Sequence, residues 1–199
     1  MLRVGLTGSI AVGKTYVCDI LRELGLPILD ADDVSRQVVA PETEGLKAIV
    51  KEFGVNVLLA DGSLDRATLG TIVFGDEAKR IKLNAIVHPL VIAAQDAWLS
   101  EMEQAGESVA VIDAALMIES GGYRRMDKLI LVTCAPAVQK KRLIDRNGYS
   151  EAEADARIGS QMSQEEKRRF ADFEIDTTDG FESTKRQVED VFKRLTAGQ

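Results

Sequence analysis

Short apolar runs alternate along the chain with amphipathic patterns of helical spacing. Five of these runs indicate β-strands, and they cover Leu2 to Thr7, Ile28 to Asp30, Val109 to Asp113, Leu129 to Cys134 and Phe173 to Asp176. The third and fourth runs are almost continuous in aliphatic residues, which is typical of strands buried on both faces. After the last run, Val188, Val191, Phe192 and Leu195 are spaced as one face of a closing helix. The alternation predicts an α/β fold in which helices cover both faces of a five-stranded, mostly parallel sheet.

Helical patterns fill the long stretch between the second and third predicted strands, about residues 33–106. The apolar face of one helix there is marked by Leu46, Ile49, Val50 and Phe53. Gly54 ends this helix, and Asp61-Gly62 predicts a turn. Two more helices are expected over Leu64 to Phe74 and Asp76 to Val87, then a break at His88-Pro89. A long helix that carries Trp98 follows the break, so the stretch predicts a helical insertion.

A second helical segment lies between the fourth and fifth predicted strands. The segments Ser150 to Glu153 and Ser163 to Glu166 match the capping-box pattern, so a short helix is expected to start at each. From about Arg146 to Lys167 few large apolar residues anchor the chain, which predicts a mobile lid. Basic residues gather in and around this segment at Lys140, Lys141, Arg142, Arg146, Arg157, Lys167, Arg168 and Arg169. A solvated helix face explains several of them, and a local site for an anion would explain their concentration.

The composition fits one substantial core and restricts the partners. The chain has 199 residues, 45% of them hydrophobic, and a formal net charge of -7. An acidic chain argues against a nucleic-acid partner, because binding to a phosphate backbone depends on a basic surface. No cleavable leader or apolar run of membrane-spanning length is recognisable, so we expect no membrane partner and a cytoplasmic location. Cys18 and Cys134 lack metal-ligand spacing and are expected to be buried, reduced thiols.

One motif points to phosphate chemistry. The segment Gly8 to Thr15 fits the pattern G-x-x-x-x-G-K-S/T, and it lies between the first strand and a helix that Gly25 ends. Glycines allow backbone N–H groups to close on an anion, and the positive end of the following helix adds attraction. In such a loop Lys14 would reach the β and γ phosphates of a nucleotide, and the Thr15 hydroxyl would bind Mg²⁺.

Carboxylates follow two predicted strands at their carboxyl ends, the edge at which parallel sheets bind ligands. Asp30 and Asp32 lie at the carboxyl end of the second strand, where a carboxylate can accept the proton of an attacking hydroxyl. Helix capping is the alternative, above all for Asp30 and Asp33. Asp113 ends the third strand as a Walker B carboxylate does and could hold Mg²⁺ through water, with a capping or turn role as the alternative. Glu119 is a further candidate for the same pocket.

Basic side chains supply the remaining candidates. His88 is the only histidine, and either a structural hydrogen bond or acceptor binding would account for it. Arg142 and Arg146 are four residues apart and share one face of the helix that follows Pro136. Arginines on one face can form bidentate hydrogen bonds to phosphate oxygens and stabilise the charge that develops in phosphoryl transfer. Arg157 lies beyond a glycine turn and could close onto the same site.

Taken together, these residues resemble the dephospho-coenzyme A kinase family, from Leu2 to the final helix. The resemblance rests on segments that occur in this order: Val4-Gly5-Leu6-Thr7-Gly8, Asp30-Ala31-Asp32 with Arg36, Leu64-Asp65-Arg66 with Val73-Phe74, Leu83-Asn84-Ala85-Ile86-Val87-His88-Pro89, Arg157-Ile158 with Gln161-Met162, Glu166-Lys167 and Ala171-Asp172-Phe173-Glu174-Ile175-Asp176.

Membership would imply the three-layer P-loop NTPase fold with a helical CoA-binding insertion and a helical lid. It would imply transfer of the ATP γ-phosphate to the ribose 3′-hydroxyl of dephospho-CoA, the last step of coenzyme A synthesis, with ATP and Mg²⁺ as cofactors. The implied parts are a nucleotide-binding core at residues 1–32, 107–145 and 171–199, a helical acceptor domain at 33–106 and a lid at 146–170. We expect a monomer or a weak homo-oligomer with dephospho-CoA as its small-molecule partner.

The resemblance also implies roles for particular residues. Asp32 matches the catalytic base, Lys14 the phosphate-loop lysine and Arg142 the arginine on the transferring phosphate, while Thr15 and Asp32 would bind the metal. The implied ATP-binding residues are Gly8, Ser9, Ile10, Ala11, Val12, Gly13, Lys14, Thr15, Tyr16, Arg142, Arg146, Asp176 and Thr177. The implied acceptor-binding residues are Asp32, Arg66, His88, Asp113, Leu116, Glu119, Arg157 and Gln161.

Three segments depart from the family pattern. The phosphate loop is poorer in glycine, with Ser9, Ala11 and Val12 at variable positions, although a backbone cradle survives such changes. The segment Ala114 to Glu119 lacks the proline and paired leucines usual after the third strand. Thr177-Thr178 replaces an asparagine-containing turn that would contact adenine.

Two other functions fit part of the pattern. A nucleoside or nucleotide kinase, or another small-molecule kinase, would share the core and the phosphate loop. A guanine-nucleotide switch would need an N-K-x-D element, which the sequence lacks. The segment Asp145 to Gly148 fits D-x-x-G but follows a helical pattern instead of a strand.

Overall fold

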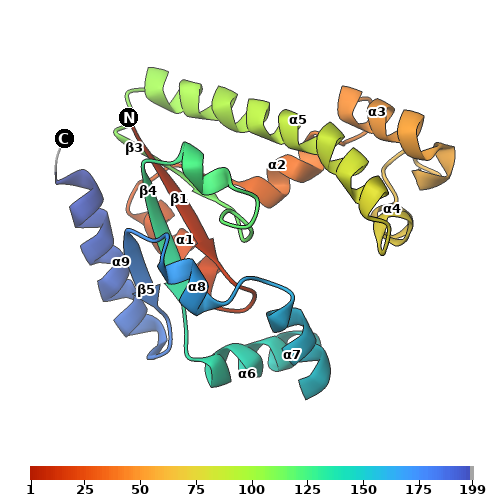
Figure 1. The fold of residues 1–199 in the computed structure, drawn as a ribbon. Helices are drawn as coiled ribbons and strands as arrows, with labels where there is room; N and C mark the ends of the chain where they lie inside the picture. The colour runs from red at the N-terminus through yellow and green to blue at the C-terminus, as the bar shows by residue number, and fades with distance from the viewer. Residues whose placement is uncertain (198–199) are drawn as a thin grey trace. The chain divides into compact units, whose positions relative to one another are not determined.

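A computed structural model describes residues 1–197, and within them five strands form one sheet (Figure 1). The strands are β1 (Leu2–Gly8), β2 (Ile28–Asp30), β3 (Val109–Asp113), β4 (Lys128–Thr133) and β5 (Phe173–Asp176). Their order is β2-β3-β1-β4-β5. The α/β fold class and the five predicted strands are confirmed, with shifts of one residue at the ends of β1 and β4.

Parallel pairing brings the carboxyl ends of the central strands to one edge. Leu6 of β1 lies opposite Asp113 of β3, and Gly8 at the end of β1 lies opposite Val132 of β4. β4 and β5 are also parallel, with Thr133 opposite Asp176. The phosphate-loop segment and Asp113 therefore leave the sheet at the same edge, as the sequence predicted.

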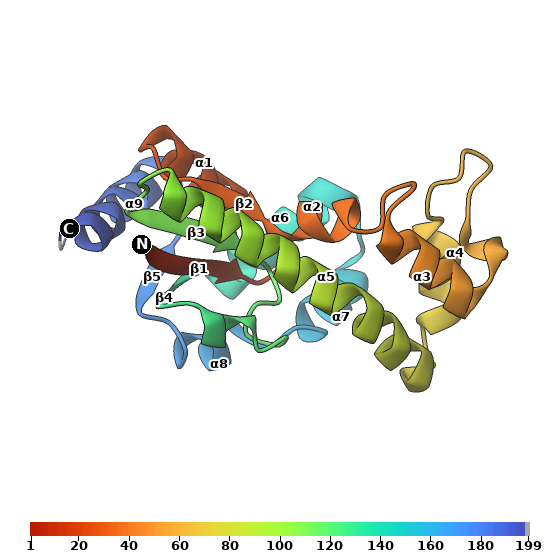
Figure 2. The ribbon, with the colours of Figure 1, turned by 90° about the horizontal axis from the view of Figure 1, so that it is seen from above.

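Helices that follow the strands along the chain lie on both sides of the sheet. They are α1 (Lys14–Glu23), α6 (Pro136–Asn147), α7 (Glu151–Gly159), α8 (Gln164–Arg168) and α9 (Gly180–Thr196), with a short 3-10 turn η2 (Gly122–Arg125). Figures 1 and 2 show α1 and α9 together on one face of the strands and α8 on the opposite face. Helices on both faces explain why β3 and the inner part of β4 are apolar on both sides.

The core between the sheet, α1 and α9 is built from aliphatic side chains. Its members include Val4, Leu6, Val17, Leu21, Val111, Ile130, Val132, Ile175, Val188, Val191 and Leu195. The predicted closing helix is confirmed, because its residues Val188, Val191 and Leu195 are buried here and Phe192 packs against them. Both predicted capping boxes are also present, at Ser150 with Glu153 and at Ser163 with Glu166.

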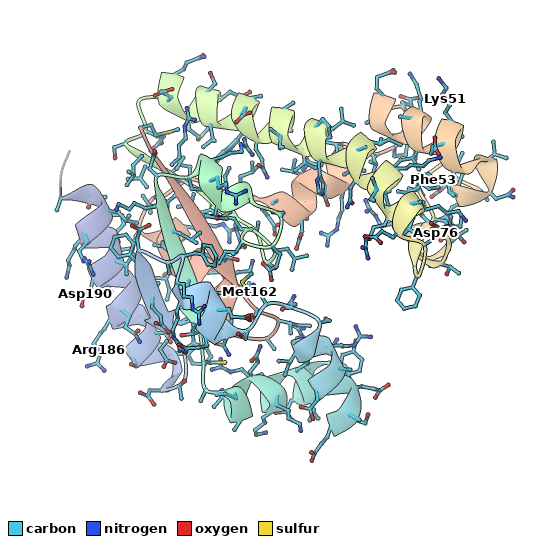
Figure 3. The ribbon with its side chains drawn as sticks, in the orientation of Figure 1. Lys51, Phe53, Asp76, Met162, Arg186 and Asp190 are labelled. Carbon is cyan, nitrogen blue, oxygen red and sulfur yellow. The ribbon has the colours of Figure 1, made fainter. Side chains whose placement is uncertain are left out.

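The chain forms two compact units. The first comprises Met1–Leu29 and Glu101–Gln199, and the second Asp30–Ser100. The second unit holds α2 (Ala31–Gln37), α3 (Glu44–Phe53), the 3-10 turn η1 (Val55–Val57), α4 (Arg66–Val73) and most of α5 (Glu77–Gln104). Its small core has Val39, Ile49, Val57 and Leu69 at the centre. Phe53, labelled in Figure 3, packs against them, and Gly54 ends α3 as predicted.

The predicted break at His88-Pro89 is wrong, because α5 runs without interruption from Glu77 to Gln104 with Pro89 inside it. An interior proline lacks the N–H that would bond the carbonyl four residues earlier and costs about 3 kcal/mol. Packing accounts for the continuity: Leu83 and Val87 before the proline pack on the core of the second unit, and Leu99 beyond it is buried.

The predicted helix over Leu64 to Phe74 is shorter at both ends. Leu64 forms an isolated antiparallel bridge with Leu58, and α4 begins only at Arg66 after the Asp65 N-cap. The Asp65 carboxylate accepts two backbone N–H bonds, so capping fixes the start. Among the described residues, no helix is long and apolar enough to cross a membrane.

Candidate active site

The phosphate loop begins where β1 leaves no room for a side chain. A Cβ atom on Gly8 would lie 2.8 Å from the Val132 carbonyl oxygen and 2.9 Å from a Val12 methyl carbon. Farther on, Ala11 and Gly13 have left-handed backbones, with φ of 61° and 91°. Glycine adopts this conformation freely, whereas alanine does so at a cost of roughly 1–2 kcal/mol. The glycine-poor loop thus keeps a tight turn, with strain at Ala11.

Gly8→Ala should destabilise the first unit by about 1–3 kcal/mol, because the new methyl group meets a backbone oxygen that cannot move freely. Chemical denaturation would measure the change. The matched control is Gly159→Ala at the end of α7, where nothing lies within 4 Å of the added carbon. That variant should be unchanged or more stable by up to about 1 kcal/mol. Equal stability of the Gly8 variant and the native protein would contradict the steric account.

Neighbouring elements hold the loop by its carbonyl groups. Gln139 of α6 donates its Nε2 to the Ile10 oxygen at 2.8 Å, and Thr177 after β5 donates its Oγ1 to the Val12 oxygen at 2.6 Å. The Ile10 N–H donates to the Gln161 side chain at 2.8 Å. The carbonyl oxygens of Ile10 and Val12, which would repel an anion, are therefore engaged by protein donors.

The amide groups of the loop remain available. In residues 1–197, no acceptor bonds the N–H groups of Ala11, Gly13, Lys14 or Thr15. These groups stand at the N-terminus of α1, where the first amides of a helix have no intrahelical partner and the helix dipole is positive. The arrangement fits a phosphate group.

Lys14, Asp113 and Cys18 form a chain of contacts at the base of the loop. The Lys14 ammonium forms an ion pair with Oδ1 of Asp113, whose side chain is 7% exposed. The Cys18 thiol donates to Oδ2 of the same carboxylate at 3.4 Å. Burial, with a smaller contribution from the negative charge of Asp113, raises the pKa of Cys18 to about 12. Asp113 therefore orients the phosphate-loop lysine.

Both cysteines should be unreactive in the folded protein, as the sequence predicted for buried thiols. Cys18 and Cys134 are buried and free of disulfides, and burial also raises the pKa of Cys134. At pH 8 roughly one Cys18 in 10⁴ would be thiolate, and only the thiolate reacts rapidly. Mass spectrometry after iodoacetamide should find neither cysteine labelled in the native state and both labelled in urea. Rapid native labelling of Cys18 would contradict this environment.

Arg142 and Thr177 form a bridge from α6 to the phosphate loop. Arg142 donates Nη1 to Thr177 Oγ1 at 2.7 Å and Nη2 to the Thr177 carbonyl at 2.8 Å. Its Nη1 also lies 3.4 Å from the Val12 oxygen. The structure thus brings Arg142, Thr177 and the phosphate loop together, as the sequence predicted.

The other predicted ATP contacts have different surroundings. Asp176 accepts the N–H and hydroxyl of Thr178, which shapes the turn after β5. Tyr16 packs edge-on against Phe181 with ring centroids 4.7 Å apart. Arg146 is exposed and donates to its neighbour Asn147. No bond links Arg146 to the phosphate loop within residues 1–197.

The turn after β3 (residues 114–121) carries two of the predicted acceptor-site residues, Leu116 and Glu119. Glu119 accepts the Met162 N–H at 3.2 Å and pairs with Lys167 at 3.0 Å, so it is engaged by protein groups. Leu116 is half-exposed. Arg157 of α7 stacks on the Tyr149 ring at 4.4 Å instead of bonding the loop.

Ion pairing explains much of the basic crowding that the sequence left open. Lys140 pairs with Glu151 and Asp155 of α7, and exposed pairs also form at Lys141 and Arg168. Lys167 departs furthest from a solvated face, because its side chain is 0% exposed. Sequence patterning missed its role, although the short α8 around it, with a capping box, was predicted.

In the second unit, Asp30 is the N-cap of α2 and accepts the N–H groups of Asp32 and Asp33. The capping alternative for Asp30 is therefore confirmed, while Asp33 pairs with Arg36 at 2.6 Å. The Asp32 side chain is exposed and has no bonding partner in residues 1–197. Exposure leaves this carboxylate accessible to a ligand.

Arg66 and His88 are the other predicted acceptor-site residues of the second unit. Arg66 is the exposed first residue of α4. His88 is exposed in the middle of α5 instead of at a helix break. Both side chains are accessible to a ligand.

Few side chains in the described part of the chain are candidates for metal ligands. The described part of the chain contains no group of three His, Cys, Asp or Glu side chains placed to hold a metal ion. The Thr15 hydroxyl is exposed at the first turn of α1 and bonds nothing in residues 1–197. Such a donor fits Mg²⁺, which usually binds one or two protein ligands together with substrate phosphates and water.

Comparisons with known proteins show the family of this chain. A family model described as dephospho-CoA kinase matches residues 2–182. The dephospho-CoA kinase of Listeria monocytogenes serotype 4b (strain F2365) is 45% identical over 195 residues, which are 96% of each chain. A crystal structure from Thermus thermophilus is 30% identical with a TM-score of 0.84, and dephospho-CoA kinase from Campylobacter jejuni is 26% identical with a TM-score of 0.76. Both structural matches cover 98% of each chain. The chain belongs to the dephospho-CoA kinase family.

Proposed function

We propose that the protein transfers the γ-phosphate of ATP to the ribose 3′-hydroxyl of dephospho-CoA, forming CoA and ADP. The observation that carries this proposal is the phosphate loop, whose amides at Ala11, Gly13, Lys14 and Thr15 lack acceptors in residues 1–197 while protein donors engage its carbonyls. Family membership over nearly the whole chain gives the acceptor its identity.

The proposed catalysis is mainly positioning and electrostatics. The loop amides and the Lys14 ammonium hold the β and γ phosphates, and Asp113 keeps Lys14 directed toward them. Arg142 lies close enough to the loop to neutralise charge that develops on the transferred group. Asp32 accepts the proton of the attacking 3′-hydroxyl.

Mg²⁺ is part of the same proposal. The Thr15 hydroxyl and Asp32 are the residues proposed to hold it. A bound Mg²⁺ would neutralise charge on the phosphates and align them for transfer. Asp113 is engaged by Lys14 and Cys18 in this structure, which favours an orienting role for its carboxylate.

Acceptor-binding residues are proposed in each unit. Arg66, His88, Leu116 and Arg157 are the candidates whose side chains are exposed or partly exposed. Asp113, Glu119 and Gln161 have protein partners, so we propose that they support the site.

The domain roles are proposals as well. Residues 1–32, 107–145 and 171–199 would form the nucleotide core, residues 33–106 the acceptor domain and residues 146–170 the lid, whose C-terminal part is anchored by the buried Lys167. A cytoplasmic monomer or weak homo-oligomer is the proposed form, without a nucleic-acid partner.

A comparison of acceptors tests the proposed function. Purified protein with ATP and Mg²⁺ should form ADP rapidly with dephospho-CoA and slowly with adenosine, AMP or shikimate, as read by a coupled assay. ADP formation that favours one of the other acceptors would assign the protein to a different small-molecule kinase.

A further inference from the structure

Lys167 is a fully buried charge at the edge of the phosphate site. Its ammonium lies 3.0 Å from Oε1 of Glu119 and donates to the Ala115 carbonyl at 3.1 Å. Burying a lysine is unfavourable unless its charge is paired and hydrogen-bonded. Both partners belong to the turn after β3, so Lys167 fixes α8 to that turn.

Glu119 extends the connection to the segment between α7 and α8. The oxygen that binds Lys167, Oε1, also accepts the Met162 N–H at 3.2 Å. Met162, labelled in Figure 3, accepts the Ser9 hydroxyl at its carbonyl, at 3.4 Å. The adjacent Gln161 side chain accepts the Ile10 N–H at 2.8 Å. A continuous set of bonds thus runs from Lys167 to two residues of the phosphate loop.

A second connection returns to β1. The Ala115 carbonyl that binds Lys167 also accepts the Thr7 hydroxyl at 3.1 Å. Thr7 lies in β1 directly before Gly8. The ion pair is therefore joined to the strand that enters the loop and, through Gln161 and Met162, to the loop itself.

We propose that the Lys167–Glu119 ion pair positions the phosphate loop by holding the Gln161–Met162 segment against Ser9 and Ile10. The proposal rests on the proposed function, because the loop is taken to bind ATP. Neither Lys167 nor Glu119 needs to touch the nucleotide. Lys167 is fully buried and the Glu119 side chain is 23% exposed. A largely buried ion pair contributes little stability beyond an apolar pair of similar volume, whereas its bonds are directional. Directional bonds can fix the place of the Gln161–Met162 segment, which an apolar contact would do less well.

Lys167→Met tests the role but leaves Glu119 without its cation. The more informative variant is the double Glu119→Met, Lys167→Met, which removes both charges and keeps similar side-chain volumes. Such apolar replacements of ion pairs are often neutral or stabilising. The Met162 N–H then loses its carboxylate acceptor, so the Gln161–Met162 segment should contact Ser9 and Ile10 less firmly.

The double variant should unfold near the native temperature yet bind a fluorescent, non-hydrolysable ATP analogue about tenfold more weakly. Its KM for ATP should rise by a similar factor, while its KM for dephospho-CoA stays within about twofold. Hydrogen exchange at residues 9–13 should quicken. The matched control is Lys140→Met. It removes a lysine that pairs with α7 and that, in the described part of the chain, has no bond to the phosphate loop.

Native-like ATP-analogue affinity in the folded double variant would overturn the proposal, as would an equal loss in the Lys140 variant. If the double variant unfolds at a much lower temperature, the ion pair supports folding and the positioning role is likewise rejected. Analogue binding needs no acceptor. If the protein failed to phosphorylate dephospho-CoA, the binding of the ATP analogue would therefore still test the positioning role.

Discussion

Asp32→Asn should lower turnover with dephospho-CoA by about 10²- to 10⁴-fold, the usual contribution of a general base. Asparagine keeps the size and much of the hydrogen bonding of aspartate but cannot take the proton of the 3′-hydroxyl. The native side chain is exposed and makes no bond in residues 1–197, so the change should leave folding intact. ATP affinity should change little, because asparagine keeps a side-chain oxygen for Mg²⁺ while Thr15 and the loop amides are unchanged. Steady-state kinetics and calorimetry with an ATP analogue would measure the two effects separately.

Asp33→Asn is the matched control for this prediction. Asp33 is the next residue in α2 and pairs with Arg36 on an exposed surface, so the change removes an equal charge from a neighbouring position. Exposed pairs of this kind contribute roughly 0–1 kcal/mol. Turnover of the control should stay within about twofold of the native value. A near-native rate for Asp32→Asn would reject Asp32 as the base.

Lys14→Ala should impair both ATP affinity and turnover. The variant loses a charge-assisted contact of about 1.5–3 kcal/mol, which corresponds to about 10- to 150-fold in affinity. Turnover should fall further, since part of the contact strengthens in the transition state. Binding of the ATP analogue and single-turnover kinetics would measure the two losses.

Stability must be followed in the same experiment, because Lys14→Ala leaves the buried Asp113 carboxylate without its ammonium partner. Thermal unfolding with and without the analogue separates loss of folding from loss of binding. Lys141→Ala is the charge control, as Lys141 is exposed and, among residues 1–197, pairs only with Asp145 of α6. Unchanged ATP affinity in the folded Lys14 variant would contradict its assignment to the phosphate site.

Local patterns predicted the elements that position the site. The β1 segment and the glycine, lysine and threonine of the loop are contiguous, so their chemistry can be recognised before any tertiary contact is known. The capping boxes at Ser150 and Ser163 are equally local, and both are present. The apolar face of α9 was predictable from its spacing, since a helix of this period must bury that face.

Tertiary contacts decided what the sequence could not predict. Pro89 lies inside α5 because packing on both sides of it outweighs the lost hydrogen bond. The burial of Lys167 is not predictable from the cluster of basic residues around it, since its partner Glu119 is 48 positions earlier in the chain and no local pattern pairs them. The positive backbone angle of Ala11 likewise follows from the closed loop, whereas its residue type suggests no such conformation.

The position of the new phosphate tests the central claim most directly. Protein incubated with Mg²⁺, dephospho-CoA and ATP labelled with ¹⁸O in the γ-phosphate should yield a product that is heavier by one labelled phosphoryl group. Phosphorus and proton NMR should place that group on the ribose 3′-oxygen, and a 3′-nucleotidase should remove it. Label found only in inorganic phosphate, or on another oxygen of the acceptor, would contradict the proposed transfer.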